Sequence, residues 1–182
     1  MDKSTEIKQY FALWKESFLV TATHDHWVRW GKLLRVWLPS TDGEPMNVET
    51  AGSFPRGLKK NTPLDLELRL LFLKGSFYKD EEEYYREKKS HRAAESYIPC
   101  GTFSPTNDPD FVESPTVLMS GTVLSVEPSE LDGDTIFKIE LRFENHIFRV
   151  LALDGFGEPG IHKGNILSGF FHVLGKVERR EE

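Results

Sequence analysis

The sequence has little of what secreted and membrane proteins require. Its 182 residues include one cysteine, Cys100, which cannot form a disulfide within the chain. No stretch approaches the roughly 18–20 apolar residues of a membrane span, and Lys3, Glu6 and Lys8 interrupt the apolar run that a signal peptide needs. We therefore expect a soluble, cytoplasmic protein with no membrane partner.

Positive charge is also in deficit. The chain carries 23 Lys and Arg residues against 29 Asp and Glu residues, a formal net charge of −6. Nucleic acids and anionic lipids are polyanions, so this balance disfavours broad electrostatic attraction to either. Two local basic clusters exist, one of Arg56, Lys59 and Lys60, and one of Arg86, Lys88, Lys89, His91 and Arg92. Because acidic residues surround the second cluster, we interpret it as a solvated face of mixed charge.

Catalytic signatures are absent as well. The sequence contains no Walker loop, no G-x-S-x-G nucleophile elbow and no paired-carboxylate arrangement. Residues 155–160 match the letters G-x-G-x-x-G, but an apolar strand pattern follows within a few residues and leaves no room for the helix that would bind a pyrophosphate. Cys100 lies in a turn-like Pro-Cys-Gly context with no recognisable base, which indicates an incidental thiol. We expect no cofactor and a non-enzymatic protein.

One pattern permits a metal site. His24-Asp25-His26 on a strand would point both imidazoles to the same side. Zinc needs three or four ligands, and the remaining histidines are scattered, so another ligand would have to come from a distant segment. A small metal-dependent enzyme that uses His24 and His26 stays open as an alternative.

What the sequence does contain is strong β patterning in its last third. From Phe137 to Phe143, apolar residues alternate with charged ones, which is the period of a half-buried strand. Asp132-Gly133 supplies the positive φ of a tight turn before this strand. The apolar run Ile147–Leu153 follows a second turn, so the two segments predict a hairpin.

Longer strands are predicted on both sides of the hairpin. Val117–Val126 contains Gly121, and Ile166–Val177 contains Gly169 and Gly175. Glycines inside strands mark the bends that let a small sheet curl and close.

Together these elements predict a mainly β (α+β) fold with one domain over residues 1–182. Residues 116–178 would form its core, a small, closed or partly open antiparallel β-barrel. Residues 1–115 would contribute an N-terminal amphipathic helix, additional strands and irregular connectors.

The N-terminal part carries weaker signals. Apolar residues spaced three and four apart predict an amphipathic helix over Thr5–Val20. The segment Thr23–Leu38 fits either a helix or a strand, and we favour a strand for its second half. Alternation over Leu64–Leu70 predicts another strand. Asp80 with Glu83 resembles a helix-capping pair at the start of a short, solvated helix.

The order of the C-terminal elements resembles an OB-fold barrel. A long glycine-bent strand is followed by a hairpin and a further strand, and a fifth strand would come from Leu64–Leu73. The helix that an OB-fold usually carries between its third and fourth strands is missing from the segment Asp154–Gly164. The resemblance implies a binding module for an oligonucleotide, an oligosaccharide or a protein.

The resemblance also implies where a ligand would bind. Basic and aromatic side chains of such a surface are the candidates, namely Phe148, Arg149, Lys163, Phe170 and His172. We expect a binding or interaction module whose ligand is unassigned. The alternative within the same fold is a protein that binds single-stranded nucleic acid, which combines a basic groove with exposed aromatic side chains.

Overall fold

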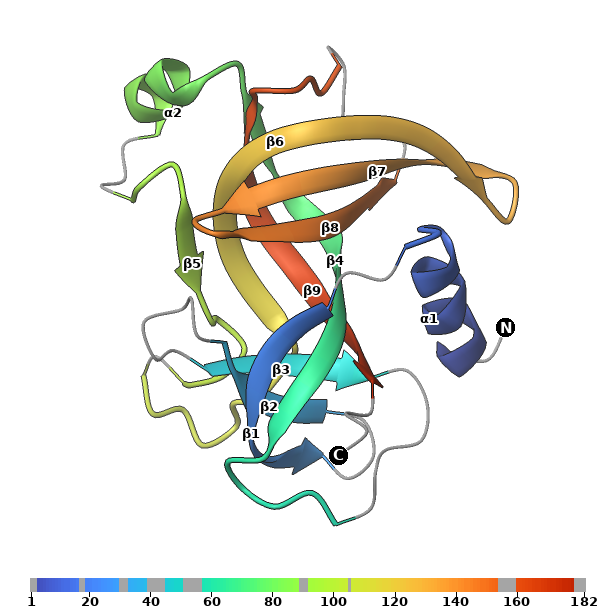
Figure 1. Ribbon diagram of the computed structural model, residues 1–182. Coiled ribbons are helices and arrows are strands. Elements are labelled where there is room, and N and C mark those ends of the chain that lie inside the picture. Colours follow the sequence, from blue (N-terminus) through green and yellow to red (C-terminus); the bar gives the residue numbers. More distant parts are fainter. Residues whose placement is uncertain are drawn as a thin grey trace. The chain divides into compact units, whose positions relative to one another are not determined.

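The chain folds mainly into β-structure. The computed structural model describes residues 3–16, 19–29, 33–38, 45–50, 57–88, 92–104, 106–153 and 160–178. Within these residues lie nine strands and two helices (Figure 1). The helices are α1 (Lys3–Ala12) and α2 (Glu81–Glu87), and neither is long or apolar enough to cross a membrane.

All nine strands belong to one sheet. They are β1 (Leu19–Arg29), β2 (Leu33–Trp37), β3 (Pro45–Thr50), β4 (Pro63–Tyr78), β5 (Ser96–Ile98), β6 (Thr116–Leu131), β7 (Asp134–Phe143), β8 (His146–Leu153) and β9 (Ile166–Glu178). Their order is β1-β2-β3-β9-β4-β8-β7-β6-β5, and β1 also pairs with β4 and β9 with β6. The pairs β3–β9 and β4–β8 are parallel, whereas β1–β2, β1–β4, β2–β3, β5–β6, β6–β7 and β7–β8 are antiparallel.

The extent of this sheet corrects the prediction of a small barrel confined to residues 116–178. β4 and β9 are 16 and 13 residues long, and each lies beside strands from both halves of the sequence. Local alternation predicts that a segment is a strand, but the partner of that strand depends on residues far away in the chain. The participation of β1, β2 and β3 in the sheet was therefore not visible in the pattern.

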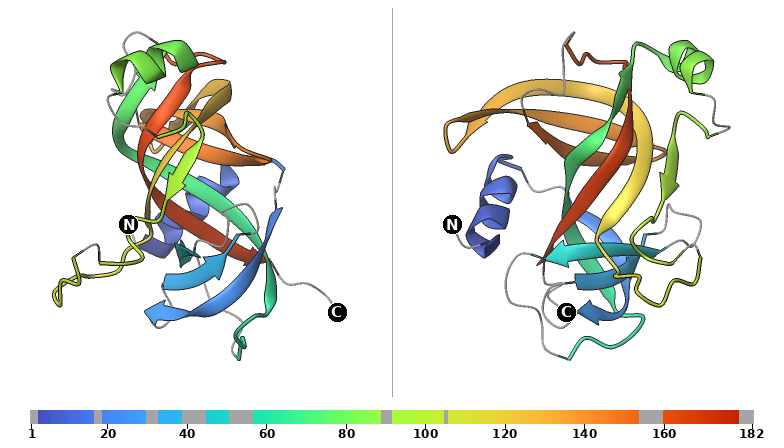
Figure 2. Two further views of the ribbon diagram at one scale, coloured as in Figure 1. Left: turned by 90° about the vertical axis from the view of Figure 1, so that its left-hand side faces the viewer. Right: turned by 180° about the vertical axis from the view of Figure 1, so that it is seen from behind.

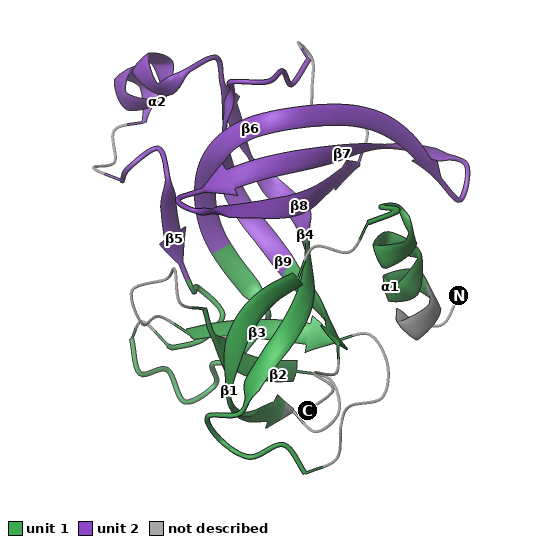
Figure 3. Ribbon diagram, viewed as in Figure 1, with its two compact units in different colours: residues 1–69, 99–117, 173–182 green, residues 70–98, 118–172 purple. Residues whose placement is uncertain are grey.

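The chain forms two compact units (Figure 3). Unit 1 comprises Met1–Arg69, Pro99–Val117 and Val173–Glu182, and unit 2 comprises Leu70–Ile98 and Leu118–His172. The division cuts β4 after Arg69 and β9 after His172, so both strands contribute residues to each unit.

In unit 1, the N-terminal helix is shorter than predicted. Two residues of its apolar stripe are buried, with Ile7 5% and Phe11 8% exposed. The helix nevertheless ends at Ala12 instead of Val20, which lies in β1. Leu19–Thr23 pair with β4, and strand pairing competes there with helical hydrogen bonding.

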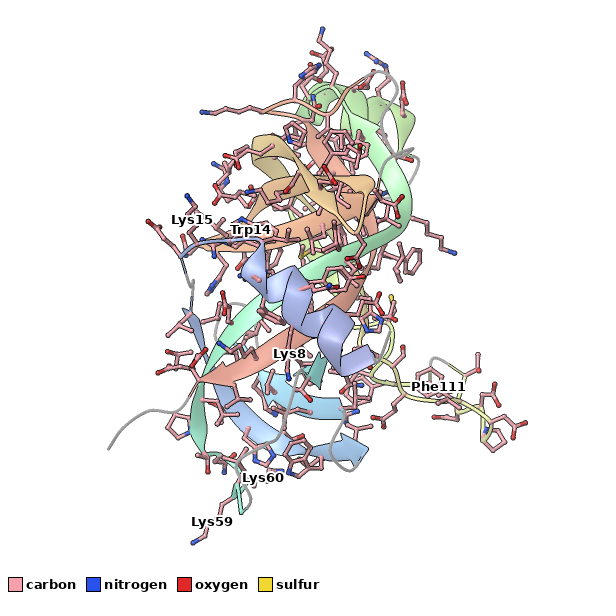
Figure 4. All side chains as sticks on the ribbon, turned by 90° about the vertical axis from the view of Figure 1, so that its right-hand side faces the viewer. Lys8, Trp14, Lys15, Lys59, Lys60 and Phe111 are labelled. Carbon is pink, nitrogen blue, oxygen red and sulfur yellow. The ribbon has the colours of Figure 1, made fainter. Side chains whose placement is uncertain are left out.

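Arg69 ties α1 to the sheet of unit 1. Its side chain is fully buried and forms an ion pair of 2.5 Å with Glu67. The guanidinium lies over the rings of Phe11 at 5.0 Å and Trp14 at 4.7 Å, the latter just beyond the helix (Figure 4). A buried arginine that is both paired and stacked is a favourable arrangement for a charge removed from water.

Two further N-terminal predictions are confirmed. The second half of Thr23–Leu38 contains β2, and the segment Leu64–Leu70 lies in β4. In β2, the residues from Leu33 to Val36 are all buried, so both faces of this strand are covered. Burial on both faces removes the alternation of apolar and polar residues, which explains why the sequence pattern was ambiguous.

In unit 2, the predicted hairpin is confirmed. β7 and β8 pair from Ile136 opposite Leu153 to Phe143 opposite His146. The turn before β7 has positive φ at Asp132 (52°) and Gly133 (90°), as a tight hairpin connection requires. β6 pairs with β7 along most of its length and arches strongly (Figure 1).

The charged segment before residue 96 contains α2. Asp80 is its N-cap, and the Asp80 side chain accepts a hydrogen bond of 2.8 Å from the Glu83 N–H, which confirms the predicted capping pair. The helix is not solvated all round, because Tyr84 is fully buried against Ala94 and Ile166. One aromatic side chain therefore anchors a helix that otherwise presents charged residues.

Two glycines let β4 and β9 approach closely in unit 2, where the strands run side by side (Figure 2). A Cβ atom at Gly169 would meet the backbone of Lys74 and Gly75, and a Cβ atom at Gly75 would meet the backbone of Ser168 and Gly169. The glycine predicted inside the last strand thus marks a contact between two backbones.

We expect Gly169→Ala to destabilise the protein by about 1–3 kcal/mol, because the added methyl group must force the two strands apart. Gly160→Ala is the matched control, since its Cβ would lie at an ordinary 3.4 Å from the His162 ring. Urea unfolding of both variants measures the difference. Equal stability of the two variants would contradict the close approach.

Candidate functional site

Two cations and a hydroxyl group meet in unit 2. Ser168 in β9 is 2% exposed, and its Oγ accepts a hydrogen bond from Lys88 Nζ. Arg92 Nη2 donates to the same oxygen at 3.3 Å, and Ser120 Oγ lies 2.8 Å from it. We call Tyr84, Lys88, Arg92, Ser120 and Ser168 the Ser168 site.

Local structure explains how these side chains meet. Lys88 follows the last turn of α2, where its N–H donates to Tyr84 O at 2.9 Å and ends the helix. Because Tyr84 is buried, the end of α2 is held at the sheet. Ser168 and Ser120 each precede a glycine in an apolar strand, and both hydroxyl groups are buried.

A chain of hydroxyl groups extends from Ser168. Ser120 Oγ lies 3.4 Å from both Tyr84 OH and Ser96 Oγ, and Tyr84 OH donates to Ala93 O at 3.1 Å. Buried hydroxyl groups require partners, and here they satisfy one another. Such a chain can reverse the direction of its hydrogen bonds when a proton is added or removed at one end.

Within the described residues, no acidic side chain compensates the charges of the site. In unit 1, Arg35 pairs with Glu113 at 2.6 Å and Arg69 pairs with Glu67 at 2.5 Å. Across the described residues, no carboxylate forms an ion pair with Lys88 or Arg92, and the buried Nη1 of Arg92 has no hydrogen-bond partner there. Two positive charges therefore share one neutral oxygen.

The environment of Lys88 disfavours its charge. Burial and the nearby charge of Arg92 lower the pKa of Lys88 from 10.5 to about 8. The amine lies over the rings of Tyr78 at 5.7 Å and Tyr84 at 5.1 Å, which take the place of water around it. At neutral pH Lys88 is still mostly protonated, so the site is positive.

This arrangement has the chemistry of an oxyanion site. Two cationic donors and a hydroxyl group converge, as they do where phosphate or carboxylate groups bind. A bound anion would offset the repulsion between Lys88 and Arg92 and would offer an acceptor to the free Nη1 atom.

The ligand-binding residues predicted from the sequence all lie in unit 2. Phe148 and Arg149 in β8 are 2% and 8% exposed, so their side chains are not presented at the surface. Phe170 and His172 in β9 are partly exposed, and Lys163, in the turn before β9, is exposed. None of these five residues belongs to the Ser168 site, although Phe170 and His172 lie on the same strand as Ser168.

The predicted metal pair is split by a β-bulge. The register of β1 shifts between His24 and His26, which breaks the alternation that would place both on one side. His24 is buried, with Nδ1 2.8 Å from Lys59 O, whereas His26 is exposed and lies 2.9 Å from Asp25. Nowhere in the described ranges do three potential metal ligands gather.

Other sequence candidates have ordinary surroundings or lie outside the described residues. Lys59 and Lys60 lie in the turn before β4 (Figure 4), and Lys60 pairs with Asp25 at 3.0 Å. Arg56, Lys89, His91 and most of the G-x-G-x-x-G segment lie outside the described residues.

Sequence reasoning missed the Ser168 site. Lys88 and Arg92 were interpreted as part of a solvated face, and Ser120, Ser168 and Tyr84 were not considered. A signal was present, because a Ser-Gly pair interrupts each of the two apolar strands β6 and β9. A hydroxyl group beside a glycine in an otherwise apolar strand indicates a buried polar group at a close backbone contact.

Asp25 provides a test of the β1 geometry. Burial raises its pKa, but hydrogen bonds from Lys60 and His26 and their charges outweigh burial and hold the pKa below its ordinary value of 3.8. The ionised carboxylate therefore stabilises the fold above the unfolded pKa, and this contribution is lost as the pH falls through the folded pKa. We expect Asp25→Asn to cost about 1 kcal/mol at neutral pH and close to nothing in acid, as measured by urea unfolding. A loss that is independent of pH would contradict this assignment.

Comparison with known proteins adds no assignment, because no protein-family model matches this chain and no curated protein has a similar sequence.

Proposed function

We propose that this protein is a binding module whose ligand presents an anionic group, a phosphate or carboxylate, to Lys88 and Arg92 at the Ser168 site. The observation that carries the proposal is the meeting of two cations at a neutral hydroxyl with no acid beside them in the part of the chain that the structure describes. By contrast, two buried arginines of unit 1, Arg35 and Arg69, each have an acid partner.

The energetic argument favours a bound anion. Like charges in a poorly solvated place repel, and an unpaired buried donor costs about 1–3 kcal/mol. An oxyanion would accept from both cations, and each charge-assisted hydrogen bond contributes about 1.5–3 kcal/mol. The protein therefore carries an incomplete set of interactions that a ligand of this chemistry would complete.

The surroundings favour a compact anion over a polyanion. The first turn of α2 carries Glu81, Glu82 and Glu83, and the whole chain has a net charge of −6. These charges repel a long polyanion but weigh less against a single charged group held by two cations. Binding of single-stranded nucleic acid is the second candidate, supported by the partly exposed Phe170 and His172 on the same strand as Ser168.

We further propose that each unit is an OB-like barrel. Five strands in the cyclic order β1-β2-β3-β9-β4 would form the first, and the pairing of β1 with β4 supports its closure. The cyclic order β6-β7-β8-β4-β9 would form the second, supported by the pairing of β9 with β6. Each ring of strands would contain one parallel pair, β3–β9 in the first and β4–β8 in the second. In the second ring, β4 would supply the fifth strand that the sequence predicted at Leu64–Leu73. Five-stranded barrels of this kind are common binding modules.

Sulfate is a suitable probe because its charge stays constant over the relevant pH range. We expect sulfate to shift the NMR signals of residues around Ser168, and Arg92→Gln or Lys88→Met to weaken its affinity about tenfold or more through loss of one charge-assisted hydrogen bond. Arg86→Gln is the matched control, since Arg86 lies at the end of α2, close to Lys88 in the sequence, but pairs with Glu83 and Glu87.

Equal weakening by all three variants would indicate a general charge effect and contradict the site. The nucleic-acid alternative predicts that a single-stranded oligonucleotide binds at low salt more tightly than sulfate does. It also predicts that substitution of Lys163 weakens oligonucleotide binding as much as substitution of Lys88 or Arg92 does. Thermal unfolding of each variant checks that the fold is retained.

The pH dependence gives a separate prediction. The protonated amine binds the anion, so the sulfate affinity should stay nearly constant from neutral pH to about 8, the pKa of Lys88. Above that value it should fall about tenfold per pH unit until the raised pKa of the complex is reached. Lys88→Met should abolish this dependence. A titration at constant ionic strength measures it, and a flat profile in the unmodified protein would contradict the role of Lys88.

A further inference from the structure

The amine of Lys88 has the surroundings of a reactive lysine. It lies against the faces of Tyr78 and Tyr84, and it shares Ser168 Oγ with the guanidinium of Arg92. Unlike Ser168, which is 2% exposed, Lys88 is partly exposed and can be reached by a ligand. Desolvation beside another cation is a recognised way to activate a lysine as a nucleophile.

Arg92 is the charged group that acts on Lys88 within the described residues. Arg92 repels its charge, and the groups that face it from β4, α2 and β9 are the neutral Tyr78, Tyr84 and Ser168. With a pKa of about 8, the amine is about half neutral at that pH. An ordinary lysine with a pKa of 10.5 would be neutral in only about one molecule in 300.

We propose that Lys88 forms a reversible imine with a 2-oxo acid whose carboxylate is bound by Arg92. The proposal rests on the anion site above and names the class of its ligand. Both nitrogen atoms reach the same oxygen, Ser168 Oγ, so the two ligand groups that they contact must be close neighbours. A carbonyl carbon bonded directly to a carboxylate meets this requirement, whereas a longer spacer between the two groups does not.

The reaction balances without any further reagent. The neutral Nζ attacks the carbonyl carbon, a C–N bond forms, and the π electron pair of the carbonyl moves to its oxygen. Transfer of a proton from nitrogen to this oxygen gives a carbinolamine, and loss of the hydroxyl group with one more proton gives the imine and one water molecule. Ser168, with its hydroxyl chain to Ser120 and Tyr84, is placed to carry these protons.

Reductive trapping tests the proposal. The full chain is incubated at about pH 8, the pKa of Lys88, with pyruvate and cyanoborohydride, and intact mass and peptide mapping locate the adduct. We expect one reduced pyruvate on Lys88, no adduct there in Lys88→Arg, and at least a tenfold slower reaction in Arg92→Gln. Lys79→Arg, at an exposed lysine outside the Ser168 site, should react like the unmodified protein.

Further arms separate this proposal from the anion site. Lactate has a carboxylate but no carbonyl group, and acetone has a carbonyl but no charge. Lactate binding without a pyruvate adduct would overturn the imine and leave the anion site standing. An equally fast adduct with acetone would overturn the 2-oxo acid assignment, and adducts spread evenly over the exposed lysines would overturn the special role of Lys88. A loss of the pyruvate adduct in the presence of excess sulfate would support both proposals.

Discussion

The close contact between β4 and β9 is the constraint on which the sheet depends. β4 lies beside β1, β8 and β9, and β9 lies beside β3, β4 and β6, so these two strands take part in half of the sheet's pairings. At Gly75 and Gly169 the two backbones leave no room for a Cβ atom. Glycine is required at both positions for steric reasons. A larger residue there would displace β4 or β9 and so disturb the strands that pair with them.

The same contact determines where Ser168 lies. Ser168 precedes Gly169, and its side chain is buried next to that of Ser120, which likewise precedes a glycine. A hydroxyl group in such a place needs partners, and Ser168 finds them in Ser120 and in Lys88 and Arg92 on the charged segment. Hydrogen bonding to Ser168 therefore holds the side chains of Lys88 and Arg92 against the buried hydroxyl groups of unit 2.

Charge placement distinguishes the Ser168 site from two buried arginines of unit 1. Arg35 and Arg69 are buried with carboxylates, and Arg35 also donates to Asn47 and to Thr102 O, which holds a connector segment against β2 and β3. These arginines have structural roles that are complete without a ligand. Lys88 and Arg92 differ because no carboxylate among the described residues forms an ion pair with either of them. This difference, more than any motif, supports a binding function.

Much of the local structure could be predicted from the sequence. Three features depend on residues that are close in the sequence, namely the hairpin of β7 and β8, the turn at Asp132-Gly133 and the cap at Asp80. The alternation of apolar and polar residues and the turn-forming residues predict them. The helix α1 was predicted with its buried stripe but too long, since its end depends on the pairing of Leu19–Thr23 with β4.

By itself, the sequence determined the mainly β class and the strands with clear alternation. Only the tertiary structure decided the sheet order, the bulge that separates His24 from His26, and the meeting of Lys88, Arg92 and Ser168. The physical reason is distance along the chain. Ser168 lies 80 residues beyond Lys88 in the sequence. Contacts over such a separation depend on how the whole backbone packs, and local periodicity does not predict that packing.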